Sequence, residues 1–341
     1  PVVGVIPYMD VDIEDEDSLS SRLETGKGKA PAAVDLAVIR FPRISNFTDF
    51  NVFSGIPGVS LRYVTRACDL GTPDMVILPG TKNTIHDLLW MRQNGLEAAI
   101  LKLADRRVPV WGICGGYQMM GEVLVDEKGV ESDLPSRTSG MGLLPLKTEF
   151  EEEKIRTQVE GAFGQLDGCL GGLSGKSIEG YEIHMGRTYI DREEGAADTA
   201  RIVSWRREPE ICRPMDYVME TGKDRLSSRQ ARMDGWNRGN IYGTYVHGIF
   251  DSPGIAGAVA EALAAAKGLC LEQAADMDYR TYRQQQYDKL AESLRENLDM
   301  AAVYRIMDIS QKGKMGISRK GKGEEKPDDG YTVGTGTAGR Y

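Results

Sequence analysis

The fold is decided by the segment Val108-Pro-Val-Trp-Gly-Ile-Cys-Gly-Gly-Tyr-Gln-Met-Met-Gly121. Its apolar start, residues 108–113, predicts a short buried strand, and a helix-compatible segment follows from Tyr117. Glycines flank Cys114, as a sharp turn with close backbone neighbours requires. A strand, a sharp turn and a helix form the nucleophile elbow of G-x-S-x-G enzymes, here with sulfur in place of oxygen. Because a helix N-terminus favours a thiolate, we expect Cys114 to be a nucleophile.

Strands and helices alternate around this segment. Strands are predicted at residues 34–41, 58–65 and 74–78, and a helix over residues 84–107, where Thr84 and Asp87 resemble a capping box. This alternation predicts an α/β fold, with a mostly parallel sheet flanked by helices and sites at the carboxyl ends of its strands. Gly80 and Cys114 both follow such strand ends, so we expect them to face each other across adjacent strands.

Composition excludes several classes of protein. The chain has 341 residues and a net charge of −9, whereas proteins that bind nucleic acid typically carry a net positive charge. No apolar run is long enough to span a membrane, and no signal peptide is visible. The five cysteines are far apart and lack C-x-x-C spacing, which argues against disulfides or a metal site and for a cytoplasmic location. The chain begins with an apolar strand-like segment, residues 2–6, and no initiating Met, so we expect it to be a piece of a longer protein.

Two of the three histidines stand in distinctive segments. Residues 135–240 predict shorter strands, and within them His184 lies on an alternating strand that ends in glycine. A later strand brings His247 into a glycine turn. After residue 252 the pattern is helical, at 255–267 and 279–306, and the tail from 309 has little to bury, which predicts disorder.

These features together resemble the class I (triad) glutamine amidotransferase domain, and within that class the cobyric acid synthase family. The resemblance extends over residues 1–308. It is carried by Arg43-Ile-Ser-Asn-Phe-Thr-Asp-Phe50, Leu78-Pro-Gly-Thr-Lys82, Trp111-Gly-Ile-Cys-Gly-Gly-Tyr-Gln118, Gly180-Tyr-Glu-Ile-His-Met-Gly186 and Gly243-Thr-Tyr-Val-His247.

The resemblance implies three parts. Residues 1–33 would be the tail of an amino-terminal synthetase domain with a linker, residues 34–308 the amidotransferase domain with C-terminal helices, and residues 309–341 a disordered tail. The synthetase domain of the family binds ATP, Mg and the corrinoid adenosylcobyrinic acid a,c-diamide. Gly175-Lys176-Ser177 lacks the first glycine of a phosphate loop, so we expect no cofactor or metal in this chain and no amidation by this chain alone.

The implied reaction is the release of ammonia from glutamine. Cys114 would attack the carboxamide to give a thioester, and His247 would move the protons. Main-chain N–H groups near Gly80 and Gly115 would hold the oxyanion. The matching motifs also place Thr81, Lys82 and Gln118 near the glutamine.

The residue that orients the imidazole of His247 is not identified by these motifs. Triad amidotransferases typically carry a glutamate two residues after the histidine, and here that residue is Ile249. The alternatives are Asp251, Glu182 or a group from another domain. Asn46, Thr48 and Asp49 are interpreted, with a slight preference, as helix-capping residues. His184 has no assigned role: it would contact glutamine, lie at a domain interface or be structural.

Other side chains are given structural interpretations. His86 is expected to be partly buried, and Lys82 to be either a surface lysine or a residue near the site. Structural roles are expected for the cysteines without a glycine elbow: Cys68, Cys169, Cys212 and Cys270.

Two other functions remain. One is a stand-alone cysteine hydrolase of the DJ-1/PfpI or γ-glutamyl hydrolase type. The other is a catalytically silent regulatory module, which the missing glutamate would favour and the presence of Cys114 and His247 opposes.

Overall fold

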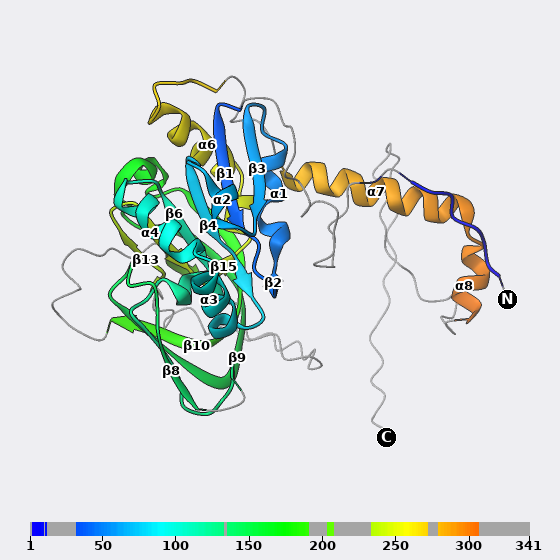
Figure 1. Cartoon of the computed structure of the whole chain (residues 1–341). Coiled ribbons are helices and arrows are strands. Elements are labelled where there is room, and N and C mark those ends of the chain that lie inside the picture. Colours follow the sequence, from blue (N-terminus) through cyan, green and yellow to red (C-terminus); the bar gives the residue numbers. More distant parts are fainter. Residues whose placement is uncertain are drawn as a thin grey trace, which may run out of the picture. The chain divides into compact units, whose positions relative to one another are not determined.

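The structure is a computed structural model that describes residues 2–9, 11, 32–132, 135–190, 203–207, 233–271 and 279–306. The chain forms two compact units (Figure 1). One unit contains Val11–Asp288, and the other combines Pro1–Asp10 with Lys289–Tyr341. The predicted disordered tail at 309–341, most of the linker before residue 34 and Cys212 lie outside the described residues.

The Val11–Asp288 unit is built on a six-stranded sheet in the order β13-β14-β6-β4-β1-β3. Its strands are β1 (Val34–Ile39), β3 (Val59–Val64), β4 (Met75–Leu78), β6 (Val110–Ile113), β13 (Trp236–Arg238) and β14 (Ile241–Thr244). Every neighbouring pair is parallel except β13 with β14. The prediction of an α/β fold on a mostly parallel sheet is confirmed.

Two groups of helices pack on this sheet (Figure 1). The first contains α1 (Asn51–Ser54) and α6 (Ile255–Ala265), and the second contains α2 (Ala67–Leu70), α3 (Thr84–Gln93) and α4 (Leu96–Asp105). The single helix predicted over 84–107 is wrong, because the chain breaks at Gly95, whose φ of 80° is a conformation that glycine adopts without steric cost. The predicted capping box at Thr84 is also wrong. The cap is Asn83, whose side chain accepts a hydrogen bond from the N–H of His86 at 2.9 Å.

A second sheet has seven strands, with β12-β11-β9-β10-β15 in order, β7 beside β9, and β8 beside β7. They are β7 (Val123–Asp126), β8 (Ser136–Ser139), β9 (Leu146–Phe163), β10 (Ser177–Ile190), β11 (Val203–Arg207), β12 (Met233–Asp234) and β15 (Val246–His247). The expectation of only short strands in this region is wrong, since β9 has 18 residues and β10 has 14. The 3-10 helix η3 (Gly168–Leu173) connects them.

The two sheets meet at the end of β14. Only Tyr245 separates β14, which pairs with β6, from β15, which pairs with β10. The chain therefore leaves the first sheet and enters the second immediately before His247.

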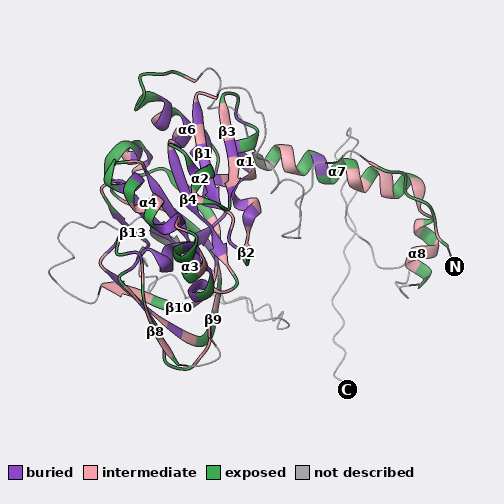
Figure 2. Cartoon of the chain, in the orientation of Figure 1, coloured by how far each residue is buried: buried purple, intermediate pink, exposed green. Residues whose placement is uncertain are grey.

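The core fixes β6 firmly. In the same sheet, β4 and most of β1 are buried (Figure 2). The indole of Trp111 on β6 is fully buried and stacks on Tyr242, with ring centroids 5.1 Å apart and 16° between the planes. Phe163 from β9 and Phe250 from the 3-10 helix η5 (Ile249–Asp251) pack edge-on against the same indole. Full burial of aromatic side chains on several elements makes the strand before Cys114 a rigid support.

The smaller unit contains the end of α7 (Tyr279–Asn297) and α8 (Met300–Ile306). Gly4 forms an isolated bridge with Leu298, and the N–H of Asp299 donates to the carbonyl of Val3 at 2.7 Å. The strand expected at residues 2–6 is reduced to this one bridge. Of the helices that the structure describes, none is long and apolar enough to cross a membrane.

Candidate active site

The elbow predicted around Cys114 is present. Helix α5 (Gly115–Met119) begins directly after Cys114, at the end of β6. Cys114 has φ 51° and ψ −111°, a conformation that costs a non-glycine residue on the order of 1–3 kcal/mol. Its N–H donates to the carbonyl of Thr244 on β14 at 2.9 Å. The neighbouring strand therefore holds the strained turn in place.

The glycines of the elbow are required by space. A Cβ at Gly116 would overlap the carbonyl of Leu78, and a Cβ at Gly112 would overlap the backbone of Tyr117. The N–H of Gly116 also donates to the carbonyl of Pro79 at 3.0 Å. Close backbone approach, as predicted, explains these two glycines.

The thiol of Cys114 lies in a nearly closed site. The residue is 8% exposed, and its Sγ donates to the carbonyl of Ile183 on β10 at 3.6 Å. A Cβ built at Gly80 would lie 3.0 Å from Cε1 of His247, and one built at Gly115 would lie 2.6 Å from Cγ2 of Thr81. The main chain of Gly80 and Gly115 is thus gathered beside the thiol and the imidazole.

His247 is held by a carboxylate from a distant segment. It is fully buried on β15, and its Nδ1 lies 2.7 Å from Oδ2 of Asp49, which is 4% exposed in the 3-10 helix η2 (Phe47–Phe50). Burial lowers the pKa of His247, but the charge and hydrogen bond of Asp49, together with Cys114, outweigh it and raise the pKa to about 10. The contact with Asp49 therefore favours the protonated imidazole. Among the described residues, its Nε2 has no hydrogen-bond partner and remains available to the thiol.

The two carboxylates proposed from the sequence as partners of His247 occupy other positions. Glu182 lies 4.0 Å from Nε2 of His184, and Asp251 lies 4.0 Å from Arg283. Both proposals are wrong as to the contact with His247.

The capping interpretation of Asp49 is wrong as well. Its carboxylate bonds to His247, and the N-cap residue of η2, Asn46, makes no side-chain cap hydrogen bond. Sequence reasoning therefore missed this functional residue. The available signal was its position in the Arg43–Phe50 motif, which the family resemblance had already marked as characteristic.

A short ribbon connects Asp49 with the turn at Gly80. The strands β2 (Ile44–Ser45) and β5 (Gly80–Thr81) are antiparallel, with Ser45 opposite Gly80. The hydroxyl of Thr81 is used within the protein, where it donates to the carboxylate of Asp87 on α3 at 2.5 Å. Thr81 is therefore placed beside the site, with its hydroxyl bonded to protein.

Gln118 has a structural place that the sequence did not indicate. It is 3% exposed, its Oε1 accepts from the hydroxyl of Thr84 at 3.0 Å, and its Nε2 donates to the carbonyl of Met185 at 2.8 Å and to the hydroxyl of Tyr245 at 3.1 Å. Both amide hydrogens are used. Gln118 therefore braces the elbow against β10 and has no amide hydrogen left for a substrate.

Lys82 and His86 are both exposed. The partial burial expected for His86 is wrong, and its Nδ1 lies 2.9 Å from the side chain of Asn83. Cys68, Cys169 and Cys270 are exposed free cysteines, whereas Cys114 is buried.

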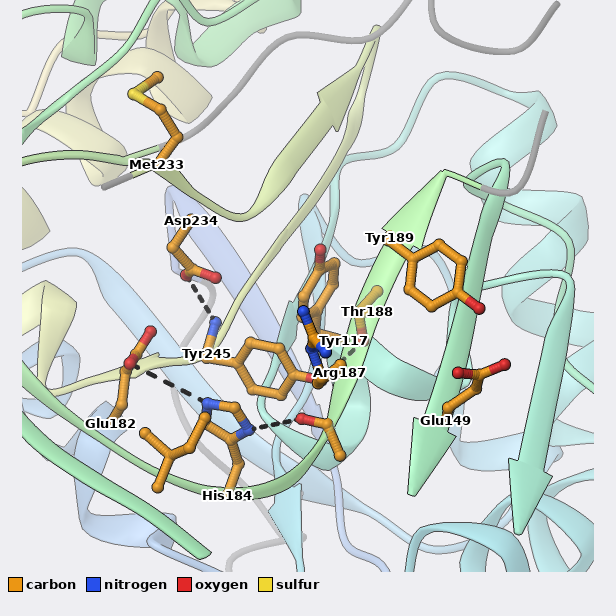
Figure 3. A pocket seen from close by; sticks show the side chains of 12 residues that line it. Tyr117, Glu149, Glu182, His184, Arg187, Thr188, Tyr189, Met233, Asp234 and Tyr245 are labelled. Carbon is orange, nitrogen blue, oxygen red and sulfur yellow. Dashed lines mark hydrogen bonds and ion pairs between the residues drawn. The ribbon is translucent and has the colours of Figure 1, made fainter. Parts of the chain in front are cut away.

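His184 belongs to a pocket next to the thiol site (Figure 3). Its ring stacks on Tyr245, with centroids 3.6 Å apart and 14° between the planes, and its Nδ1 lies 3.2 Å from the carbonyl of Gly186. The pocket has a volume of about 530 Å³ and is lined by polar residues that include Glu182 and Asp234. Neither Cys114 nor His247 lines it. His184 therefore lines this pocket, whereas the thiol of Cys114 lies outside its lining.

Residues 35–255 match the model of the CobB/CobQ-like glutamine amidotransferase domain. The chain belongs to this family. A cobyric acid synthase of Ruminiclostridium cellulolyticum is 47% identical over 309 residues, which cover 90% of this chain and 55% of that protein. One of Lachnoclostridium phytofermentans is 43% identical over 308 residues, with coverage of 90% and 56%. The chain thus spans about half the length of the curated relatives it matches.

A solved structure of a glutamine amidotransferase superposes with a TM-score of 0.43 and 12% identity, over 67% of this chain and 98% of that chain. So loose a superposition adds nothing to the family assignment. In this CobB/CobQ-like amidotransferase domain, Gly175-Lys176-Ser177 leads directly into the strand β10. A phosphate loop requires a helix N-terminus at that point, so this segment does not fit ATP.

Proposed function

We propose that this domain hydrolyses glutamine to glutamate and ammonia, with Cys114 as the nucleophile. The observation that carries the proposal is the alignment of three buried side chains: Asp49 bonded to Nδ1 of His247, and Cys114 on a strained elbow beside the same imidazole. This is the arrangement that nucleophilic acyl transfer requires, in which a base is oriented by a third group and contacts the nucleophile.

In the first half of the reaction, the Cys114 thiolate forms a bond to the carboxamide carbon of glutamine. The C=O π electrons move to oxygen, which becomes the oxyanion. Collapse of this intermediate breaks the C–N bond, and the imidazolium of His247 delivers its proton to the departing nitrogen, so that ammonia leaves. In the second half, His247 takes a proton from water, whose oxygen attacks the thioester. The C–S bond breaks and releases glutamate.

The oxyanion would be held by main-chain N–H groups at Gly80 and Gly115. Gly115 follows Cys114 directly, and Gly80 lies against the imidazole of His247. Loss of one such donor typically costs about 100- to 1000-fold in rate.

The ammonia would be used by a synthetase portion that corresponds to the part of the relatives outside the aligned region. The relatives named cobyric acid synthase are nearly twice as long as the aligned region, which leaves room for such a portion. We propose that ATP, with Mg, activates carboxylates of adenosylcobyrinic acid a,c-diamide there, and that ammonia from this domain amidates them.

The test measures ammonia release from glutamine by the chain, together with covalent labelling by a diazoketone analogue of glutamine. Labelling at Cys114, located by peptide mass mapping, reports a competent thiol even where turnover is slow. Cys114→Ala is expected to abolish both signals, and Cys68→Ala, at an exposed cysteine, is the matched control that retains them.

Three outcomes would contradict the proposal. The first is labelling that is independent of Cys114. The second is esterase or peptidase turnover without glutamine hydrolysis, which would favour a stand-alone hydrolase. The third is an absence of both turnover and labelling, which would indicate a silent module.

A further inference from the structure

Tyr181 on β10 touches both segments that carry the Asp49–His247 pair. Its ring lies nearly parallel to the imidazole of His247, with centroids 5.3 Å apart and 19° between the planes. Its hydroxyl accepts a hydrogen bond from the side-chain amide of Asn46 at 2.7 Å, and Asn46 stands just before the η2 helix that contains Asp49. Asp49 and His247 are 198 positions apart in the sequence. A single tyrosine therefore bridges two segments whose alignment the reaction requires.

The backbone fixes Tyr181 in this place. Tyr181 and His247 are directly opposite each other in the antiparallel pair of β10 and β15. The preceding residue is Gly180, where a Cβ would overlap the carbonyl of His247, so the two strands approach closely. Asn46 has φ 53°, a left-handed conformation that asparagine tolerates better than most residues, and it directs its amide to the tyrosine.

Other groups surround the edges of the imidazole. Asp49 holds Nδ1, Cys114 lies on the Nε2 side, and Gly80 stands against Cε1. These contacts restrict movement of the ring in its own plane, but a tilt out of that plane requires a group on the face. Tyr181 supplies that group, and with 37% of its surface exposed it also separates this face of His247 from solvent.

We propose that Tyr181 is a positioning residue that holds the imidazole of His247 in the plane joining Asp49 and Cys114. The inference rests on the proposed glutamine hydrolysis. The aromatic ring sets the tilt of the imidazole, and the hydroxyl bond to Asn46 keeps the Asp49 segment against it. Tyr181 itself makes no bond to glutamine in this proposal.

The test separates the ring from the hydroxyl by steady-state glutaminase kinetics. Tyr181→Ala is expected to lower kcat by about 10- to 100-fold, because small misplacement of a catalytic group costs up to about 100-fold. Tyr181→Phe restores the stack and should come within about fivefold of the wild type, the effect of one neutral hydrogen bond. Asn46→Gly keeps the left-handed backbone and should lower kcat as much as Tyr181→Phe does. The variant that combines Tyr181→Phe with Asn46→Gly should have a kcat no lower than either single variant, because both changes remove the same hydrogen bond.

The matched control is Tyr287→Ala, at a tyrosine of similar exposure on α7, which should leave kcat unchanged. Thermal unfolding identifies a variant that fails to fold, and the Tyr181→Phe and Asn46→Gly pair then decides the question. A kcat for folded Tyr181→Ala within about twofold of the wild type would overturn the proposal. So would a raised KM at unchanged kcat, because that pattern indicates a lost substrate contact.

A second readout does not depend on glutamine. The rate of Cys114 alkylation by iodoacetamide, followed by peptide mass mapping, measures thiolate formation, and His247→Ala sets its lower limit. The alkylation rate of Tyr181→Ala should fall towards that of His247→Ala, and the rate of Tyr181→Phe should stay near that of the wild type. If the chain hydrolyses no glutamine but the alkylation follows this order, the proposed function fails while the positioning role stands. Equal alkylation rates in Tyr181→Ala and the wild type would overturn the positioning role.

Discussion

Asp49→Asn should convert the site from one that carries a protonated imidazole to one that carries a neutral imidazole. The substitution keeps the shape of the side chain and removes the charge that lies 2.7 Å from Nδ1 of His247. Burial, which lowers the pKa of His247, remains, whereas the opposing carboxylate is lost. An asparagine amide also donates to Nδ1 and so favours the wrong tautomer. We expect kcat/KM to fall by about 100- to 10,000-fold, the upper end being the effect of the same change in a serine-protease triad.

The pH profile gives the sharper measurement. With its pKa raised to about 10, His247 in the wild type keeps its proton throughout the neutral range, and the alkaline limb of kcat/KM should lie near that value. In Asp49→Asn the limb should move to the ordinary histidine range near 6.5 or below. The assay is glutaminase activity, or labelling of Cys114 by the diazoketone, across this range.

Stability should follow the same titration. Because the folded-state pKa of His247 lies above its unfolded value, protonated His247 stabilises the fold fully below the unfolded value of 6.5, and this contribution is lost as pH rises through about 10. The interval corresponds to roughly 5 kcal/mol at most. In urea unfolding, the free energy of unfolding of the wild type should therefore decrease as pH rises from 6.5 to about 10, and that of Asp49→Asn should change much less.

The matched control is Asp74→Asn. Asp74 is a half-buried carboxylate that pairs with Lys267 and stands just before β4, at the end of that strand away from Gly80. It should alter stability without moving the alkaline limb. If Asp49→Asn retains the wild-type limb, or if Asp74→Asn moves it equally, Asp49 is not the group that holds the proton on His247.

Three further predictions follow from the same contacts. Gly80→Ala places a Cβ 3.0 Å from Cε1 of His247, so glutaminase kcat should fall by about 10- to 100-fold. Circular dichroism should show an intact fold, and an unchanged kcat would contradict this packing. Gln118→Ala removes the three hydrogen bonds of a buried side chain and should lower the free energy of unfolding in urea by about 2–4 kcal/mol. A variant whose only change is a raised KM would instead support a role in glutamine binding. Trp111→Ala leaves a cavity under the elbow and should cost about 3–5 kcal/mol by the same measurement, and a cost under about 1 kcal/mol would show that β6 is not held by this packing.

The sequence predicted those parts of the site that depend on neighbours along the chain. The elbow at Cys114 could be predicted because the apolar run, the glycines and the following helix all stand within fourteen residues. The parallel sheet could be predicted because strands and helices alternate at regular spacing. The break at Gly95 within the predicted helix shows the limit of such patterns, since apolar spacing continued across a glycine that starts a new helix.

Contacts across long distances in sequence could not be predicted in this way. Asp49 precedes a buried aromatic and resembles a capping residue locally, and only tertiary structure brings its carboxylate to His247. The same holds for Gln118, whose amide is used by Thr84 and by residues on β10 and beyond. The pairing of β10 with β15, which places Tyr181 opposite His247, is likewise invisible to a window of ten or fifteen residues.

Ile249 stands where triad amidotransferases typically carry a glutamate, and here it is fully buried in the apolar core beside Phe250. A carboxylate arriving from the first strand region makes an acid at that position unnecessary and frees it to contribute hydrophobic packing. In this domain the acid that orients the imidazole precedes it by 198 positions instead of following it by two. If the proposed glutamine hydrolysis is confirmed, a hydrophobic residue two places after the histidine will be no sign of an inactive amidotransferase.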